Sequence, residues 1–293
     1  MTHTEGSPRV PVLVVVGVGL IGGSFCAALR KAGFVGRIIG AGRNPQSLQR
    51  AVDLGLVDEV RSLADAAKDA DLVFLATPVG AMRAVFAELR PYLKEGAVVT
   101  DAGSSKGDVV EVARAELGDR IACFVPGHPI AGSEQSGPEA ASATLYQGRD
   151  VVLTPLAENT PEAIALVRSA WDACGARIHC MSAVEHDEVL ASVSHLPHLL
   201  AFAYMLQVGG TRNVQQRLDL AGSGFRDFTR IAGSSPEMWR DILLANRHAI
   251  LHELDEYRKV LDDLVRALHD GDGDGLTRAL ARASDLRRGW SLS

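Results

Sequence analysis

The stretch VPVLVVVGVGLIGGS, residues Val10–Ser24, predicts how the first half of this chain folds. Its first seven residues are apolar and rich in valine, which is typical of a strand buried on both faces of a parallel sheet. The glycine pattern Gly17-x-Gly19-x-x-Gly22 follows at once, and a helical pattern runs from Leu20 to Lys31. A strand, a glycine turn and a helix in this order are typical of a dinucleotide-binding unit.

Each glycine of this motif has its own physical role. Gly17 permits the tight turn, Gly19 lets the backbone approach a pyrophosphate, and Gly22 lets the helix pack closely against the strand. The helix N-terminus then offers unpaired N–H groups and a positive dipole end to the phosphates. The alternative is a strand–helix turn that is merely tight. We expect the cofactor to contact Gly17, Gly19, Leu20, Ile21 and Gly22.

Composition and charge describe a globular chain of 293 residues, which is long enough for two domains. The net charge is −6 and there is no basic run, so nucleic acid is not an expected partner. The N-terminal residues are polar and no apolar run approaches 18 residues, which predicts neither a signal peptide nor a membrane span. We therefore expect a cytoplasmic protein. Four cysteines without C-x-x-C spacing are expected to be free thiols.

Strand patterns alternate with helical patterns up to about residue 181. This alternation predicts an α/β fold with a Rossmann-type, doubly wound and mostly parallel sheet in a dinucleotide-binding domain at residues 1–181. Residues 182–293 are predicted to form an all-α domain. After the first strand, further strands are predicted at 37–42, 71–76, 97–101, 121–125, 151–154 and 176–180, with a helix at 161–173.

The predicted helical domain begins with one long segment from Ser182, interrupted by Pro197. Pro236 is well placed to start another helix, which runs through Leu268, and a last helix ends near Arg288. The helix after Pro236 carries an apolar stripe at alternating three- and four-residue spacing. Such a stripe is mostly core, or it packs against a second subunit.

The end of the second predicted strand bears on the choice of cofactor. An Asp or Glu usually follows this strand and binds the ribose diol of NAD, but here Gly42, Arg43 and Asn44 follow it. A cation without the acid accommodates a 2′-phosphate, so NADP is favoured and NAD remains possible. The alternative is that Arg43 stacks on the adenine and tolerates either cofactor. Thr77 and Pro78 end the next strand, where a cofactor lies in this fold.

Polar groups follow two further strands at the edge where a ligand is expected. Ser104 and Ser105 follow one strand, and His128 follows another in the small-residue loop Gly127–Gly132. Histidine is the natural proton acceptor when a hydroxyl-bearing carbon loses a hydride. His128 is therefore the predicted catalytic base, and Ser104 or Ser105 could share a hydrogen bond with the same hydroxyl. A lone histidine is otherwise a common core or surface residue.

The helical domain supplies a second group of polar side chains. His195 and His198 are three residues apart on one helix, but no third ligand is spaced for a metal. Arg226 and Arg230 flank a short segment that contains Asp227. This segment is either a solvated, ion-paired loop or an arginine fork that binds a substrate carboxylate. Together these side chains indicate a small polycarboxylate substrate.

Five motifs in order resemble the prephenate/arogenate dehydrogenase family over nearly the whole chain. The resemblance implies oxidative decarboxylation of prephenate to 4-hydroxyphenylpyruvate, or of arogenate to tyrosine, in tyrosine biosynthesis. It also implies a homodimer built on the helical domains. The matching stretches are Gly17-Val-Gly-Leu-Ile-Gly-Gly-Ser24, Thr100-Asp-Ala-Gly-Ser-Ser-Lys-Gly107, Gly127-His-Pro-Ile-Ala-Gly-Ser-Glu134, Val193-Ser-His-Leu-Pro-His198, and Gly224-Phe-Arg-Asp-Phe-Thr-Arg-Ile-Ala232 followed by Met238-Trp-Arg240.

The same resemblance implies roles for particular residues. It makes His128 the catalytic histidine that deprotonates the 4-hydroxyl, with Ser104 hydrogen-bonding beside it. Many family members carry an acid at the position of Gly42, so its absence favours NADP here. The remaining implied substrate residues are Arg230 on the side-chain carboxylate, His198 in the pocket, Asp227 and Glu134 as gate residues at its mouth, and Trp239 reaching in from the partner subunit.

Two other classes of protein share this architecture. The β-hydroxyacid dehydrogenases and imine reductases are one class, and those hydroxyacid enzymes resemble one another in using a lysine from the helical domain. Lys259 is the only lysine after Lys106, and it lies in a charged stretch of a long helix, which argues against them. A non-catalytic NADP-sensing protein is the other class. It would not need His128, Ser104 and Arg230 together.

Overall fold

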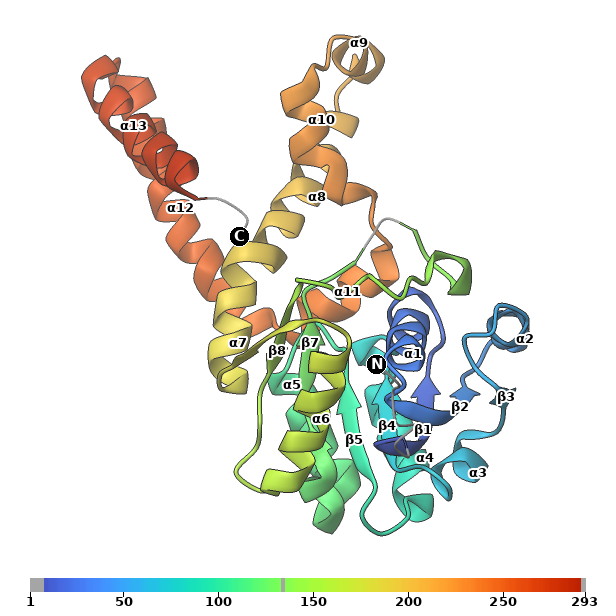
Figure 1. The fold of residues 1–293 in the computed structure, drawn as a ribbon. Helices are drawn as coiled ribbons and strands as arrows, with labels where there is room; N and C mark the ends of the chain where they lie inside the picture. The colour runs from blue at the N-terminus through green and yellow to red at the C-terminus, as the bar shows by residue number, and fades with distance from the viewer. Residues whose placement is uncertain (1–7, 133–134, 291–293) are drawn as a thin grey trace, which may run out of the picture.

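The computed structural model describes residues 8–132 and 135–290. An α/β part forms the base of the molecule, and a helical part stands above one edge of its main sheet (Figure 1). The last strand ends at Cys180, and the helices of the second part begin at Ala183. The predicted fold class, a Rossmann-type sheet followed by an all-α part, is confirmed.

The main sheet has six parallel strands in the order β3-β2-β1-β4-β5-β6, as expected of a doubly wound fold. The first strand lies near the middle, with Val16 paired to Ala41 on one side and to Leu75 on the other. The strands are β1 (Val10–Val16), β2 (Val35–Ala41), β3 (Glu59–Val60), β4 (Leu72–Leu75), β5 (Val98–Asp101) and β6 (Phe124–Val125).

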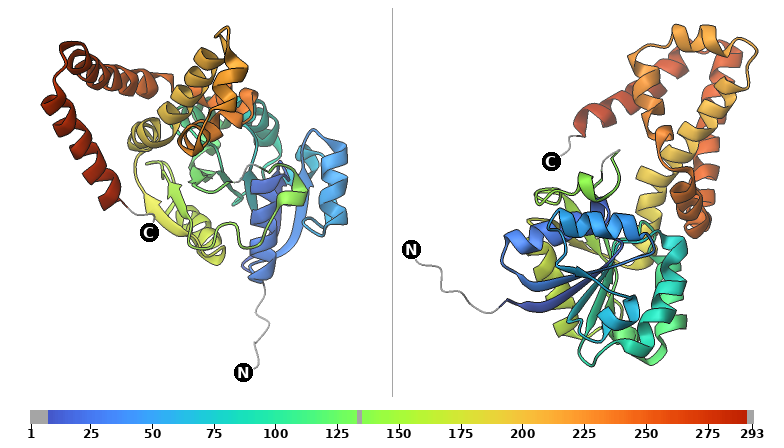
Figure 2. Two further views of the ribbon diagram at one scale, coloured as in Figure 1. Left: turned by 90° about the horizontal axis from the view of Figure 1, so that it is seen from above. Right: turned by 90° about the vertical axis from the view of Figure 1, so that its right-hand side faces the viewer.

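Helices cover both faces of this sheet (Figure 2). Because side chains alternate along a strand, Leu13 and Val15 enter one core cluster while Val14 and Val16 enter the other. The continuous apolar run in β1 therefore reflects burial on both faces. Helices α1 (Leu20–Lys31), α2 (Pro45–Asp53) and α6 (Pro161–Ala173) pack on the first face, and α3 (Leu63–Ala67), α4 (Met82–Leu89) and α5 (Gly107–Leu117) on the second.

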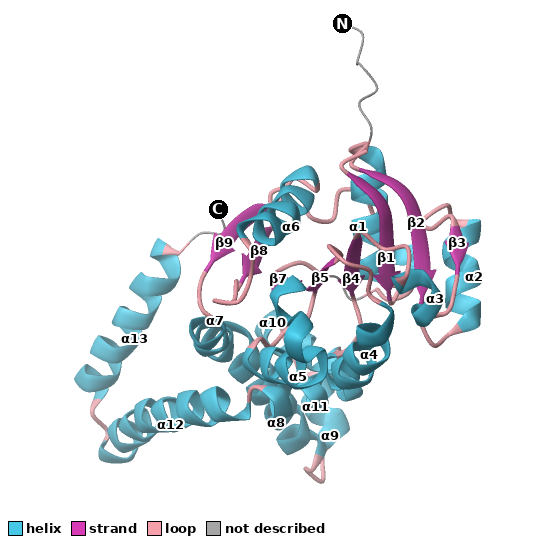
Figure 3. Ribbon diagram, turned by 90° about the horizontal axis from the view of Figure 1, so that it is seen from below, coloured by secondary structure: helices cyan, strands magenta, loops and turns pink. Residues whose placement is uncertain are grey.

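A separate three-stranded sheet contains β7 (Gly127–Pro129), β8 (Asp150–Leu153) and β9 (Arg177–Cys180). The prediction that the last two strands extend the parallel sheet is wrong, because β8 pairs with β7 in antiparallel fashion and β9 pairs with β8, which makes a second sheet (Figure 3). The N–H of Gly127 donates to the side chain of Asp101, so the ladder with β5 does not continue past this point. His128 consequently lies on a short strand, where we had predicted a loop.

The helical part contains α7 (Ala183–Leu190), a π-helical turn (Ala191–His195), α8 (Leu196–Gly209), α9 (Val214–Asp219), α10 (Ser223–Thr229), α11 (Pro236–Ala245), α12 (Arg247–Asp270) and α13 (Gly273–Gly289). Pro197 does not interrupt the first segment, because it lies in the first turn of α8, where its missing N–H is tolerated. The single helix predicted from Pro236 through Leu268 is divided into two, α11 and α12. Helix α11 ends at Ala245, where the side chain of Asn246 turns inward to bind other groups.

Helices α12 and α13 form an arm that projects from the rest of the chain (Figure 1). The apolar stripe of α12 is not core within this chain, because Leu251, Leu261 and Leu268 are 56%, 43% and 67% exposed. The continuous helical segment Ala183–Gly209 is also apolar, with a mean hydropathy of 1.5 in its most apolar window and only 28% of that window buried. By length and hydropathy alone this segment could span a bilayer, which our sequence reading did not anticipate; such a single helix is weak support for a span.

Candidate active site

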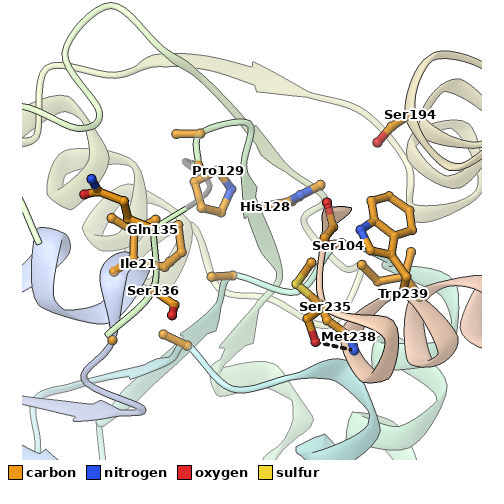
Figure 4. A pocket seen from close by; sticks show the side chains of 18 of the residues that line it. Ile21, Ser104, His128, Pro129, Gln135, Ser136, Ser194, Ser235, Met238 and Trp239 are labelled. Atoms are coloured by element: carbon orange, nitrogen blue, oxygen red, sulfur yellow. Dashed lines mark hydrogen bonds between the residues drawn. The ribbon is translucent and has the colours of Figure 1, made fainter. Parts of the chain in front are cut away.

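A cavity of about 750 Å³ lies between the strand ends of the α/β part and the helical part. Figure 4 shows Ser104 and His128 close together in this cavity, with Trp239 on one side and Ile21 on the other. Five segments build the wall: the start of α1, the end of β4, the loop after β5, strand β7 with the loop that follows it, and the helical part from the π-helical turn to α11. They contribute Gly19, Leu20, Ile21, Gly22, Ser104, His128, Ser194, His195, Arg230, Met238 and Trp239, among others.

The glycine turn has the shape that a bound dinucleotide needs. A Cβ at Gly17 would lie 2.5 Å from the carbonyl oxygen of Ala76, and Gly17 has a φ of +93°. A Cβ at Gly22 would lie 2.1 Å from the carbonyl oxygen of Gly17. Gly19, in contrast, faces open space beside the first turn of α1, so a phosphate can approach the backbone there. These residues fit a dinucleotide.

The other predicted cofactor residues lie in two places. Thr77 and Pro78 line a smaller cavity of about 220 Å³, whose wall includes Ile21 and Ser104 from the large one. Arg43 is exposed just after the end of β2. A Cβ added at Gly42 would lie 3.7 Å from the nearest atom of Leu48, which is ordinary contact, so the fold leaves room for a side chain at this position.

His128 is one of two buried histidines that line the cavity, the other being His195. Its Nδ1 lies 2.9 Å from Nε2 of His186, and its backbone pairs with Val152 across the antiparallel ladder. Burial, together with the nearby His186, Lys106 and His195, holds the pKa of His128 well below its ordinary value of 6.5. The imidazole is therefore neutral near pH 7 and can accept a proton.

A buried ion pair connects the two polar loops of the site. Nζ of Lys106 donates to the carboxylate of Asp101 and, at 2.8 Å, to the carbonyl oxygen of Gly127. The carboxylate of Asp101 also accepts from the N–H groups of Gly103 and Gly127. The loop that carries Ser104 is thereby joined to the strand that carries His128. Sequence reasoning treated Lys106 as one more polar loop residue and missed this pair.

His195 and His198 both flank Trp239. The ring of His198 stacks on the indole with centroids 3.6 Å apart, and the ring centroid of His195 is 6.1 Å from the indole. Nδ1 of His198 donates to the carbonyl oxygen of Ser194 at 2.9 Å. Burial lowers the pKa of His198; the bond to Ser194 opposes this shift and the charge of Arg230 adds to it. His198 therefore packs against Trp239 and is not itself among the residues of the cavity wall.

His195 connects the helical part to the loop of Ser104. Its Nδ1 lies 3.0 Å from the amide nitrogen of Asn246, and it hydrogen-bonds the main chain of Ser104. Burial lowers the pKa of His195 to about 4, so the ring is uncharged near pH 7. Within residues 8–132 and 135–290, no group of three His, Cys, Asp or Glu side chains is placed to hold a metal ion.

The remaining predicted substrate residues are only partly brought together. Arg230 and Trp239 line the cavity, and Trp239 is 6% exposed and reaches the cavity of its own chain, whereas we had expected it to come from a partner. Asp227 lies exposed on α10, away from the cavity wall. Glu134 falls outside the described residues. Sequence reasoning missed His186, Asp187 and Asn246 altogether, since buried polar residues on a helix or between two helices carry no spacing signal.

A Rossmann-type sheet with a glycine turn, and a buried neutral histidine in a cavity closed by helices, define a dinucleotide-dependent oxidoreductase. Residues 25–180 match the family model described as prephenate dehydrogenase, nucleotide-binding domain, and residues 182–282 match prephenate dehydrogenase, dimerization domain. The chain belongs to the prephenate dehydrogenase family. The family and the enzyme class predicted from sequence are confirmed.

Known relatives match nearly the whole chain. It is 38% identical to a cyclohexadienyl dehydrogenase of Zymomonas mobilis, covering 94% of both chains. It is 36% identical to a prephenate dehydrogenase of Bacillus subtilis, covering 96% of this chain and 76% of the relative. The solved prephenate dehydrogenase of Aquifex aeolicus, in complex with hydroxyphenyl propionate and NAD+, is 39% identical with a TM-score of 0.90, covering 95% of this chain and 98% of the relative.

Proposed function

We propose that this chain catalyses the oxidative decarboxylation of prephenate to 4-hydroxyphenylpyruvate, in tyrosine biosynthesis, with NADP+ as the preferred cofactor. One observation carries the proposal: a neutral, buried His128 lies beside Ser104 in a cavity that also contains the glycine turn and Arg230. A hydride acceptor, a proton acceptor and a carboxylate-binding cation are the groups that this reaction requires.

The residues of the α/β part hold the cofactor in this proposal. Gly17, Gly19, Leu20, Ile21 and Gly22 bind the pyrophosphate at the start of α1, and Thr77 and Pro78 contact the cofactor from the neighbouring strand end. The bound nicotinamide supplies a hydride acceptor. We assign residues 1–181 to cofactor binding and residues 182–293 to substrate binding and dimerisation.

His128 is the proton acceptor of the reaction. As C4 of prephenate loses its hydrogen as hydride, the 4-hydroxyl becomes a carbonyl and its proton binds Nε2 of His128. Ser104, beside His128 in the cavity, hydrogen-bonds the same oxygen and fixes its position (Figure 4). The ring carboxylate then leaves as carbon dioxide, its bonding electrons make the ring aromatic, and the resulting phenolate oxygen takes the proton back from His128. Aromatisation supplies the driving force, so the protein chiefly orients the substrate and accepts the proton.

The helical part holds the other end of the substrate. Arg230 lines the cavity and binds the side-chain carboxylate of prephenate. Trp239 forms the wall beside it, and His198 fixes the indole by stacking. Asp227 and Glu134 are proposed as gate residues at the cavity mouth. This proposal places Asp227 near the substrate only if α10 closes over the cavity, because Asp227 is exposed.

The preference for NADP rests on the end of β2. Gly42 leaves room at the place where an acid binds the ribose diol, and the exposed Arg43 next to it is available for a 2′-phosphate. The Aquifex aeolicus relative was solved with NAD+, so NAD remains the second candidate for this chain.

We also propose a cytoplasmic homodimer. The exposed apolar stripe of α12 and the half-exposed apolar surface of α8 are the surfaces that a second copy of this chain would cover. The dimerization-domain match over residues 182–282 supports this assembly.

Turnover by the purified enzyme tests the proposed reaction. Mixing the protein with prephenate and NADP+ should produce the absorbance of the reduced nicotinamide together with carbon dioxide and 4-hydroxyphenylpyruvate. Arogenate is the second substrate to test, because it differs only in having an amino group where prephenate has a keto group. No reduction with prephenate or arogenate under either cofactor would leave the hydroxyacid-dehydrogenase and cofactor-sensor alternatives.

A further inference from the structure

A line of three hydrogen-bonded side chains runs from the cavity into the protein interior. Nδ1 of His128 lies 2.9 Å from Nε2 of His186, and Nδ1 of His186 lies 2.8 Å from Oδ1 of Asp187. The side chain of His186 is completely buried, and that of Asp187 is 11% exposed. His186 and Asp187 belong to α7, so the helical part contacts the predicted base directly.

The far end of this line is a firmly held carboxylate. Oδ1 of Asp187 accepts from the N–H of Lys106, and Oδ2 accepts from the N–H of Gly107, both at 2.8 Å. Burial would raise the pKa of Asp187, but the hydrogen bond from His186 and those from the two N–H groups outweigh it and hold the pKa below 3.8. Asp187 is therefore a carboxylate near pH 7, which can only accept hydrogen bonds.

The position of each proton follows from that carboxylate. Because Asp187 only accepts, Nδ1 of His186 carries a proton. The side chain of His186 is completely buried, where a neutral ring avoids the cost of taking a further charge out of water. A neutral His186 with its proton on Nδ1 has a free lone pair on Nε2, so Nδ1 of His128 is the donor between the two rings. The lone pair of His128 is then left on Nε2.

We propose that His186 and Asp187 are positioning residues that fix the tautomer of His128, presenting Nε2 as the proton acceptor, and that the Asp187 carboxylate stabilises the imidazolium formed during turnover. This inference rests on the function proposed above. The proton from the substrate hydroxyl binds Nε2 of His128, the Nδ1 proton stays in its hydrogen bond to His186, and no electrons are transferred along the line. The arrangement follows the logic of a base oriented by a hydrogen-bonded anion.

Other charged or titratable groups near the line set its electrostatics. The carboxylate of Asp187 is the anion nearest to His186, and the pair of Asp101 and Lys106 is internally neutralised. Removing the charge of Asp187 should therefore make His128 a weaker base. The groups that face His128, His186 and Asp187 from the packed elements are Asp101, Lys106, Asp108 and His195.

Two substitutions at one position separate the tautomer role from a packing role. His186→Leu removes the acceptor for the Nδ1 proton of His128, so kcat should fall by roughly 100-fold or more while KM for prephenate changes little. In His186→Gln the amide oxygen can occupy the place of Nε2 and accept the same proton, so kcat should recover to within about tenfold of the wild type. Equal losses in both variants, or wild-type kcat in His186→Leu, would overturn the proposal.

The pH profile tests the role of Asp187. Asp187→Asn should lower the plateau of kcat and shift its acidic limb to lower pH, because the base loses its stabilising anion. A lower plateau with an unshifted limb would mean that Asp187 only supports the fold. His179→Leu is the matched control, because His179 contacts Asp150 at 2.9 Å in an exposed histidine–carboxylate pair, and kcat should not change.

A measurement without turnover keeps this inference separate from the proposed function. In the wild-type protein with 15N-labelled histidine, NMR should show His128 protonated at Nδ1 and unprotonated at Nε2 near pH 7.5, with the signals assigned by their loss in His128→Asn. The opposite tautomer would overturn the inference even if prephenate is turned over. Failure of the wild type to oxidise prephenate would instead overturn the proposed function and leave the tautomer result standing.

Discussion

Lys106 and Asp101 form a salt bridge in which both side chains are fully buried. The pair also binds the backbone of Gly103 and Gly127, so it connects the loop of Ser104 to the strand of His128. A buried pair of this kind contributes little net stability compared with apolar residues, but breaking it by removing one partner leaves an unpaired charge. The pair therefore serves chiefly to set the geometry of the site.

Lys106→Met should destabilise the protein by about 3–5 kcal/mol, because it leaves the Asp101 carboxylate buried without a cation. Urea unfolding followed by circular dichroism measures this change. The control is Lys68→Met, since Lys68 and Asp65 form a salt bridge with side chains that are 55% and 63% exposed. That variant should lose less than about 1 kcal/mol. Similar losses in the two variants would mean that the buried pair has no special role.

The stability of the fold should depend on the protonation of His195. Burial lowers the pKa of His195 in the folded protein to about 4 from 6.5. The unfolded chain therefore binds the proton first, and the stability contributed by the neutral ring is complete above pH 6.5 and lost as the pH falls toward 4. Between pH 7.5 and 4.5 this loss amounts to about 2 kcal/mol.

Urea unfolding at these two pH values measures that loss. His195→Gln should be less stable than the wild type at pH 7.5 and should lose less stability on acidification. The pKa of His128 is also lowered in the folded protein, so acidification destabilises the fold through His128 as well. Part of the pH dependence should therefore remain in His195→Gln. His269, which is 87% exposed in its side chain, provides the control, because His269→Gln should retain the wild-type dependence. An unchanged pH dependence in His195→Gln would contradict the low pKa of this ring.

Cofactor preference should follow the residues at the end of β2. Gly42→Asp introduces a carboxylate where a ribose diol binds and where a 2′-phosphate would be repelled, so the ratio of kcat/KM with NADP to that with NAD should fall by roughly tenfold or more. Arg43→Ala should lower kcat/KM with NADP and leave it nearly unchanged with NAD. Arg50→Ala is the control, since Arg50 is an exposed arginine of α2 that pairs with Glu139. If neither substitution changes the ratio of kcat/KM with NADP to that with NAD, these residues do not set a preference for NADP.

Substrate affinity should depend on Arg230. Arg230→Ala removes a charged hydrogen-bond donor from the cavity, so KM for prephenate should rise by roughly 10- to 100-fold. The KM for the cofactor should stay near that of the wild type, because Arg230 belongs to the helical side of the cavity. Arg226→Ala is the matched control on the neighbouring turn, where the exposed Arg226 lies off the cavity wall. Equal KM values in both variants would exclude Arg230 as the carboxylate ligand.

Most of the α/β part could be predicted from the sequence because the patterns that define it involve residues close together in the chain. The apolar run in β1 and the glycines after it depend on steric rules that act within a few residues, and α1 and α6 begin and end where the pattern predicted. The three-stranded sheet was not foreseen, since the side chain of Asp101 that binds Gly127 acts across 26 residues of sequence. Likewise, the break at Asn246 depends on contacts with Asp187 and His195 that lie more than 50 residues away.

In the site, too, features set by neighbouring residues could be predicted, whereas those set by contacts distant in sequence could not. Motif spacing identified His128, Ser104 and Arg230, which all line one cavity. Nothing in the spacing identified His186 or Asp187, because their importance comes from packing α7 against β7, a contact that is visible only in the folded chain. The sequence predicted the apolar stripe of α12, but it did not show whether the stripe faces the core of this chain or a second subunit.

The most direct test of the account compares kcat/KM of the wild-type enzyme for prephenate and arogenate, each with NADP and NAD, alongside His128→Asn as the variant without the base. We predict the highest value for prephenate with NADP, and a loss of roughly 100-fold or more in kcat for His128→Asn with cofactor binding retained. Near-normal turnover by His128→Asn, or no turnover of either substrate with either cofactor, would contradict the account.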